Sequence, residues 1–195
     1  MFSTRRSTDA SIADALARAK SLPFNYPSPL FTQFGSKQVH VPPRYALDHT
    51  HSQIGKGQEA FNAGKEAMRQ WQHFNLGWVR VANPDAQIQI DQIVAVEAHS
   101  PGFSRLGLWS VNLSRILYVI DEERRFGYGY GTTSMHVERG EERFLIEYDP
   151  ATGKVIYDLL AVSHPAHWMA LLAYPYTRSQ QHRFARDSHA RMAQL

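Results

Sequence analysis

A two-residue hydrophobic period that recurs between residues 78 and 162 constrains this chain more than any other feature. Apolar side chains alternate there with mostly polar ones, which is the pattern of strands with one buried face. The predicted strands cover residues 78–81, 88–98, 109–120, 125–133, 143–148 and 154–162. The last two flank a short Asp-Pro-Ala-Thr-Gly turn and form a hairpin. Successive strands with short connections predict an antiparallel meander.

Helical periodicity appears on both sides of this region. Residues 57–74 place apolar side chains three and four positions apart, which predicts an amphipathic helix. A shorter helix is predicted over residues 9–20, and a long one over residues 166–192. Pro175 falls inside the long helix and must kink or split it, because proline lacks a backbone donor and clashes with the preceding turn.

These elements predict an α+β fold in which a curved antiparallel sheet of five to seven strands grips the long C-terminal helix. A single curved sheet needs a cover for its buried face, and only the last helix is long enough to supply it. An N-terminal helix and an arm are added to this body. The order of elements resembles the helix-grip layout of plant pathogenesis allergens and lipid-transfer START domains.

The length of 195 residues indicates one domain, residues 1–195. Within it, residues 1–8 are short, polar and terminal, so we expect them to be flexible. Residues 21–50 combine prolines with aromatic side chains, which predicts an extended arm packed on the body. The main body is expected over residues 55–192.

Composition excludes several classes of function. The chain has no cysteine, so it has no disulfide, no thiolate nucleophile and no cysteine-ligated metal. The segment from residue 174 onward accounts for the whole formal charge of +3, and such a basic end on a neutral body predicts no nucleic-acid partner. No apolar run is long enough to span a membrane or to serve as a signal peptide, so we expect a cytoplasmic protein.

Three segments together resemble one protein family. The residues that carry the resemblance are Gly55, Lys56, Gly57, Phe61, Trp71, Phe74, Gly77 and Trp78, then Tyr130, Gly131, Thr132, His136, Glu138 and residues 140–144, then Ser163, Pro165, His167, Pro175, Arg178, Gln181, residues 183–186 and Ser188. They are similar to uncharacterised protein family 0548, a domain-of-unknown-function group of bacteria and plants, over roughly residues 20–192. The resemblance implies no established reaction, substrate or cofactor, and it assigns no catalytic residue.

The densest polar cluster follows the strand with alternating glycines and consists of His136, Glu138, Glu141 and Glu142. One interpretation is a small-molecule enzyme of the cyclase or hydrolase type, in which Glu138 or Glu141 orients His136 as acid or base. It predicts a buried His136 with a carboxylate partner. The glycines beside the cluster would leave room for a ligand against the strand. The alternative is a solvated loop in which Glu142 pairs weakly with Arg143.

The aromatic residues favour a different function, the binding of an apolar or lipid-like small molecule. A curved sheet closed by a helix can enclose an apolar cavity, and we expect Tyr128, Tyr130, His136 and Trp168 at its mouth. The alternative is a solid aromatic core. A third hypothesis is a structural or interaction module that acts through the arm. We expect no cofactor, and the sequence leaves the oligomeric state open.

Two other clusters have weaker interpretations. His164 with His167, and Asp48 with His49 and His51, are spaced like metal ligands, but neither provides a full ligand set, so no metal site is expected. A stripe on the last helix suits either an anionic partner or plain solvation. It consists of Arg178, His182, Arg186 and His189.

Overall fold

The expected sheet is present in the computed structural model, which describes residues 2–27, 29–100, 107–165 and 174–195. Its strands are β1 Phe2–Ser3, β2 Ala46–Lys56, β3 Val79–Val81, β4 Ile93–Ser100, β5 Leu108–Asp121, β6 Arg125–Thr132, β7 Glu138–Tyr148 and β8 Lys154–Pro165. Its helices are α1 Asp9–Ala19, α2 Gly57–Arg69, the 3-10 turn η1 Gln72–Phe74 and α4 Tyr174–Met192.

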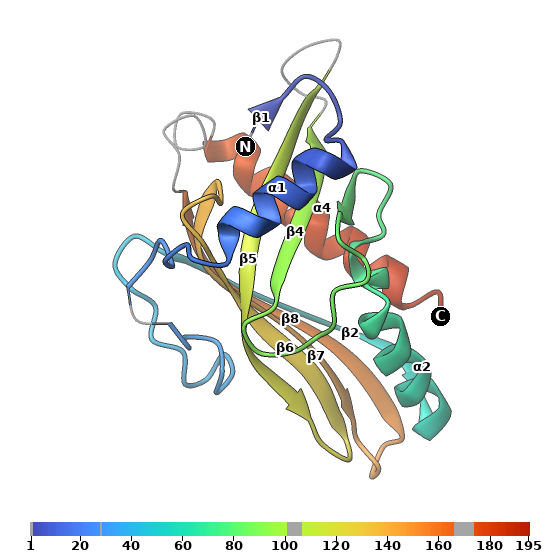
Figure 1. Cartoon of the computed structure of the whole chain (residues 1–195). Helices are drawn as coiled ribbons and strands as arrows, with labels where there is room; N and C mark the ends of the chain where they lie inside the picture. Colours follow the sequence, from blue (N-terminus) through green and yellow to red (C-terminus); the bar gives the residue numbers. More distant parts are fainter. Residues whose placement is uncertain (1, 28, 101–106, 166–173) are drawn as a thin grey trace.

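Seven strands form one antiparallel path in the order β2-β8-β7-β6-β5-β4-β3, and the short β1 pairs with β5. The path is a meander from β3 to β8, and β2 is added beside β8 at the far edge. The sheet twists and curls strongly, so that it has an inner, concave face and an outer, convex face (Figure 1). The predicted fold class is confirmed.

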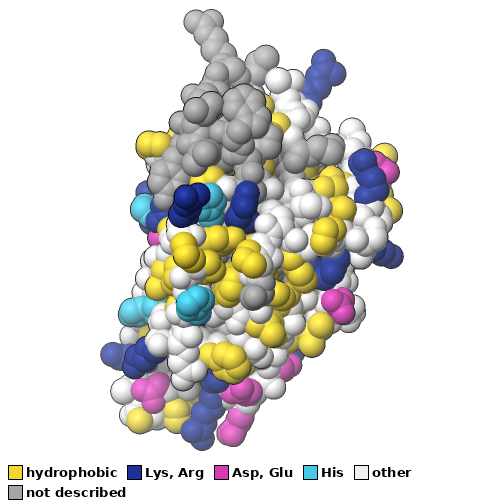
Figure 2. Space-filling view, turned by 90° about the vertical axis from the view of Figure 1, so that its left-hand side faces the viewer, with side chains coloured by type: hydrophobic (Ala, Val, Ile, Leu, Met, Phe, Trp, Pro, Cys, Tyr) yellow, Lys and Arg dark blue, Asp and Glu magenta, His cyan; other side chains and the backbone are white. Residues whose placement is uncertain are grey.

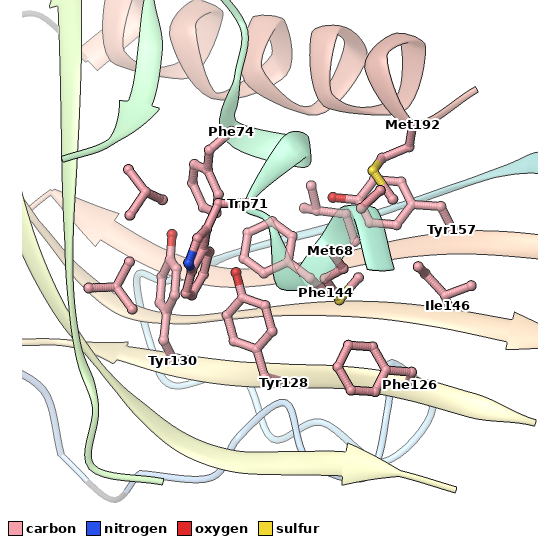
Figure 3. Packing of buried hydrophobic residues seen from close by; sticks show 14 of the residues in the cluster. Met68, Trp71, Phe74, Phe126, Tyr128, Tyr130, Phe144, Ile146, Tyr157 and Met192 are labelled. Atoms are coloured by element: carbon pink, nitrogen blue, oxygen red, sulfur yellow. The ribbon is translucent and has the colours of Figure 1, made fainter. Parts of the chain in front are cut away.

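Helix α4 lies against the inner face, as the sequence predicted. Its Ser188 hydroxyl is 2.9 Å from the Tyr157 hydroxyl of β8, and its Gln181 donates to Glu138 of β7. Near its end, Met192 is fully buried beside Tyr157 (Figure 3). Pro175 lies in the first described turn of α4. Residues 166–173 of the predicted helix are outside the described residues, so the expected kink stays a prediction.

The inner face is solid where α2 and η1 cover it. Gly64 of α2 lets the helix approach the sheet, since a Cβ there would lie 3.1 Å from side-chain carbons of both Ile54 and Ile146. The rings of Trp71, Phe74, Tyr128 and others fill this end between the sheet and α4 (Figure 3). The fully buried members with the largest side chains are Tyr128, Tyr157, Phe74, Phe144, Met68, Ile116, Ile146 and Met192.

The outer face is covered by α1 and by the arm. Ile12, Ala15 and Ala19 of α1 pack against residues of β4 and β5 such as Ala95 and Leu113. The arm, residues 21–27 and 29–45, contacts the outer face of β5, β6 and β7. Two of its side chains remain exposed, Leu30 at 42% and Phe34 at 69%. Figure 2 shows the face on this side, where hydrophobic side chains gather near the middle of the view.

The alternating glycines of β6 lie on the outer face, where neighbouring side chains of the protein occupy the space beside Gly129 and Gly131. A Cβ at Gly129 would lie 2.3 Å from the Tyr118 ring, and one at Gly131 would lie 2.2 Å from the Tyr26 hydroxyl. The room that these glycines leave is therefore filled by two tyrosine side chains of the protein itself. This corrects the expectation that the glycines make a ligand space.

The start of β4 and the N-terminal segments differ from the sequence analysis. Ile88 and Ile90 precede the strand, because Asp91 adopts a φ of 66° and turns the chain before β4 begins. The arm ends at residue 45, since Ala46 already pairs with Ser163 of β8. Residues 2–7, expected to be flexible, are held by the pairing of β1 and by Glu97, which accepts hydrogen bonds from Arg6 and from the Ser7 backbone.

Candidate functional site

The other end of the inner face is hollow. A cavity of about 1300 Å³ lies between the sheet and α4. Its floor comes from the inner faces of the strands, and residues of α4 such as Gln181 and Phe184 form its roof. Phe2 and Leu47, which are 38% and 42% exposed, line it where it reaches the surface.

Small side chains make this hollow. The register aligns Gly140 of β7 with Ser163 of β8, and Glu142 of β7 with Ala161 of β8. One step further along the strands, the same face carries Phe144 opposite Leu159, and there the interior is filled. The change from short to bulky side chains therefore separates the cavity from the solid core.

At the hollow end, solvent accessibility along β8 differs between the outer and the inner face of the sheet. The outer-facing Leu160 and Val162 are fully buried beneath the arm side of the sheet. Between and beyond them, the inner-facing Ala161 and Ser163 are partly accessible, although they lie under α4. At this end the inside of the curled sheet is more open than its outside.

Glu142 marks the boundary between the hollow and the core. It stands directly opposite Tyr130 of β6 in the strand register, and both side chains line the cavity. The Tyr130 hydroxyl donates a hydrogen bond of 2.6 Å to Oε2 of Glu142. Within the described residues Oε1 accepts no hydrogen bond and no cation forms an ion pair with this carboxyl. Figure 3 shows the Tyr130 hydroxyl directed from β6 toward the side of α4.

The surroundings of Glu142 make its ionised form unfavourable. Burial raises its pKa, the Tyr130 hydrogen bond lowers the pKa in part, and the negative charges of Glu138 and Asp48 raise it again, to about 7. Burial and the adjacent Glu142 also hold the pKa of Tyr130 well above its usual range, so Tyr130 remains a donor. The carboxyl keeps part of its surface accessible because the cavity opens onto it.

The neighbouring polar groups of the cavity are already paired. Arg178 of α4 makes two hydrogen bonds, of 2.5 and 2.6 Å, to the two oxygens of Asp48 on β2. Gln181 donates to Glu138 at 2.8 Å and to Ser163 at 3.1 Å. Burial raises the pKa of Glu138, while the Gln181 hydrogen bond and Arg178 counteract this effect. These contacts fasten α4 to three strands at the hollow end.

His136 lines the cavity with Glu138, but the two side chains do not form an acid–base pair. The Nδ1 atom of His136 accepts a hydrogen bond from the backbone N–H of Glu138 at 3.0 Å. Burial lowers the pKa of His136 to about 4, so the ring is neutral near pH 7. Among the described contacts no carboxylate orients this ring, which the enzyme hypothesis requires.

The remaining predicted residues are separated from one another. Glu141 points to the outer face, where it binds the arm through Tyr26, Leu30 and Thr32. Tyr128 is fully buried in the solid core, with its hydroxyl 2.8 Å from His73. Trp168 lies outside the described residues. Of the four residues expected at the mouth, the structure places Tyr130 and His136 on the cavity wall.

Sequence reasoning did not place Glu142 on the inner face, because it treated residues 136–142 as a loop. Continuing the two-residue period of β7 backward from Ile146 and Phe144 places Glu142 on the same inward face. A carboxylate on an otherwise apolar strand face is the signal that identifies it. Asp48 was considered as a metal ligand, whereas the structure pairs it with Arg178.

Two further features limit what the site can be. No group of three or more His, Cys, Asp and Glu residues that could hold a metal ion occurs in the described part of the chain. His49 instead contacts Asp158 at 2.5 Å on the outer face, next to the ion pair of Arg143 with Asp158. None of the described helices has the length and apolar character needed to cross a membrane.

Comparison with known proteins identifies the family. A family model described as domain of unknown function DUF1990 matches residues 31–191. The chain belongs to this family. A UPF0548 protein of Dictyostelium discoideum is 33% identical over 204 residues, which cover 96% of this chain and 92% of the relative. The resemblance to uncharacterised protein family 0548 is thereby confirmed.

Solved structures also resemble this family member, at low sequence identity. Hypothetical protein jhp0584 from Helicobacter pylori aligns with a TM-score of 0.50 at 8% identity, over 76% of this chain and 85% of that chain. Ara h 8.0201 aligns with a TM-score of 0.46 at 11% identity, over 77% of this chain and 99% of that chain.

Proposed function

We propose that this protein binds an apolar or lipid-like small molecule in the cavity between the curled sheet and α4. The observation that carries the proposal is the hollow itself, about 1300 Å³ of space on the inner face. Pockets for small molecules commonly measure roughly 300–1,000 Å³ and combine apolar walls with a few polar groups. A protein interior is otherwise packed to the density of organic crystals, so a hollow of this size calls for an occupant.

The walls suit an amphipathic ligand. Phe74, Val96, Leu159 and Phe184 offer apolar surface to the chain or ring system of the ligand. Polar groups of β6, β7 and α4, such as Tyr130, Glu142 and Gln181, also line the cavity and can fix the orientation of a head group. Tyr130 and His136 line the cavity, and a role in binding for them and for Trp168 remains a prediction.

Binding of the neutral dye Nile red by the purified full-length chain tests this proposal. We expect a rise in fluorescence with saturable binding, which a long-chain alcohol such as decanol reverses by competition. The variant Ala161→Phe places a ring in the hollow, because Ala161 is a small wall residue between Glu142 and Asp48. It should weaken dye binding by about tenfold or more.

The matched control is Ala151→Phe, the same substitution at an exposed alanine in the turn between β7 and β8. This variant should bind the dye as the unmodified chain does. If the unmodified chain binds neither dye nor alcohol, or if both variants bind equally well, the cavity is not a binding site for apolar molecules.

An enzyme that uses His136 with Glu138 or Glu141 is the alternative function. Three observations favour binding over this mechanism. His136 is neutral with a lowered pKa, its Nδ1 is engaged by a backbone N–H, and Glu141 serves the arm on the opposite face.

A further inference from the structure

At Glu142 the hydrogen-bonding capacity left unused on the cavity wall is that of an acceptor. The donors near Glu142 are already engaged, because Tyr130 donates to Glu142, Gln181 to Glu138 and Arg178 to Asp48. Oε1 of Glu142 accepts no hydrogen bond within the described residues. A ligand head group that completes this site must therefore donate hydrogen bonds.

The charges near the site point in the same direction. Arg178 is paired with both carboxylate oxygens of Asp48, and Arg186 of α4 forms an ion pair with Asp187 at 3.0 Å. Among the described residues, no cation pairs with Glu142. A carboxylate surrounded by protein and by two other carboxylates gains most from a positively charged partner.

We propose that the ligand is an apolar molecule with a protonated amine, and that the amine binds Oε1 of Glu142 at the inner end of the cavity. This inference rests on the proposed binding function and specifies the ligand class. The ammonium group donates to Glu142 while its apolar body lies along the hollow toward the surface. The Tyr130 hydroxyl holds the other oxygen of the carboxylate, so the acceptor is oriented before the ligand arrives. The rings of Tyr130 and Phe74, which line the same wall, add cation–π attraction.

Three probes with the same ten-carbon chain test the head group: decylamine, decanol and decanoic acid. Each is titrated against the Nile red complex at pH 7.5, below its micelle concentration. We expect decylamine to displace the dye at a concentration about tenfold lower than decanol, and decanoic acid to be the weakest.

The variant Glu142→Gln removes the charge and keeps an oxygen that can accept from Tyr130. It should bind decanol as before and lose the preference for decylamine. The control Glu123→Gln neutralises a carboxylate whose side chain is 87% exposed and should keep the preference. Equal displacement by decylamine and decanol in the unmodified chain, or a preference that survives in Glu142→Gln, overturns the inference. Either result leaves the proposed binding function intact, because dye binding and the Ala161→Phe variant test that function separately.

A pH series supplies an independent readout. The titratable and charged groups around Glu142 include Tyr128 and Tyr130 of β6, Glu138 of β7, Tyr157 of β8, Asp48 of β2, and Arg178 and His182 of α4. Decylamine binding should strengthen between pH 5 and 8, because Glu142 must ionise to pair with it. The same series in Glu142→Gln measures how the other groups change decylamine affinity with pH, and the difference between the two series gives the contribution of Glu142.

Tyr130→Phe sharpens this readout. The variant removes the hydrogen bond that favours the ionised carboxyl, so the rise in decylamine affinity should move to higher pH. A decylamine affinity that falls as the pH rises would mean that protonated Glu142 donates to the ligand, and it would refute the amine proposal.

Discussion

Glu141 and Glu142 are adjacent in sequence, yet they lie in opposite environments on the two faces of β7. On the outer face, Glu141 is 2% exposed and accepts hydrogen bonds from Tyr26, from the Leu30 backbone, and from both the backbone and hydroxyl of Thr32. On the inner face, Glu142 accepts from Tyr130 and faces a hollow. The outer carboxylate holds the arm against the sheet through hydrogen bonds, and the inner carboxylate has an oxygen that can still accept a hydrogen bond.

The comparison teaches how a strand separates stability from function. Buried polar groups cost free energy unless they are satisfied, and Glu141 is satisfied by donors from the arm. Glu142 is not satisfied to the same degree, and the raised pKa reports the cost. The outer face therefore supports the fold, while the inner face is available for a ligand.

The largest expected effect separates the two glutamates by stability. Glu141→Gln should lower the free energy of unfolding by about 3 kcal/mol, because the new amide group would oppose donors from Leu30 and Thr32. Glu142→Gln should change it by less than about 1 kcal/mol at pH 7, since Gln still accepts from Tyr130 and the penalty of a buried charge disappears. Urea unfolding monitored by circular dichroism measures both. Equal losses would remove the distinction between the faces.

A second comparison concerns packing. Gly129→Ala should destabilise the fold by about 2 kcal/mol, because its Cβ would meet the Tyr118 ring and the outer face has no space to yield. Ala161→Val adds volume on the inner face, where the cavity can accept it, and should cost less than about 0.5 kcal/mol. Thermal unfolding of the two variants gives the answer, and a larger loss for Ala161→Val would contradict the assignment of the hollow.

The smallest effect is a pH dependence of stability. The pKa of Glu142 rises from 4.5 to about 7 on folding, so the folded state binds the proton more tightly than the unfolded chain. Stability from this group is complete below pH 4.5 and is lost as the pH rises through about 7. Water that reaches the carboxyl through the cavity reduces the effect to about 1–2 kcal/mol.

Glu142→Gln supplies the reference for that measurement. The difference in unfolding free energy between the unmodified chain and the variant should decrease from pH 4.5 to pH 8. A difference that stays constant over this range would show that the pKa of Glu142 is the same in the folded and unfolded chain.

The sequence predicted the sheet because side chains alternate over residues 88–98 and along β6, and because a clear turn separates β7 from β8. It predicted α4 against the inner face from the length of that helix alone. It could not reveal β2, because Asp48, His49 and Thr50 carry polar side chains on both faces of an edge strand. A polar edge strand shows little hydrophobic alternation, so its partner strand β8 defines it.

The candidate site was harder to predict. Tyr130 and His136 were placed at the cavity from residue type, and the structure puts both on its wall. The hypothesis that Glu138 or Glu141 orients His136 assumed a loop, whereas β7 continues through both glutamates and directs them to opposite faces. Tyr128 and Tyr130 looked equivalent in the sequence. They differ because the neighbour opposite Tyr128 is Phe144, which fills the space, and the one opposite Tyr130 is Glu142.

The alternation along β7 also restricts how this chain can change in length. Because successive side chains point to opposite faces, sliding β7 by one position against β6 would send Glu141 into the hollow and Glu142 under the arm. Insertions and deletions can therefore be absorbed in the connection between Thr132 and Glu138, but not inside the strand itself. Members of the family that retain both carboxylates should vary in length there and keep the Glu-Glu pair at a fixed distance from the aromatic core.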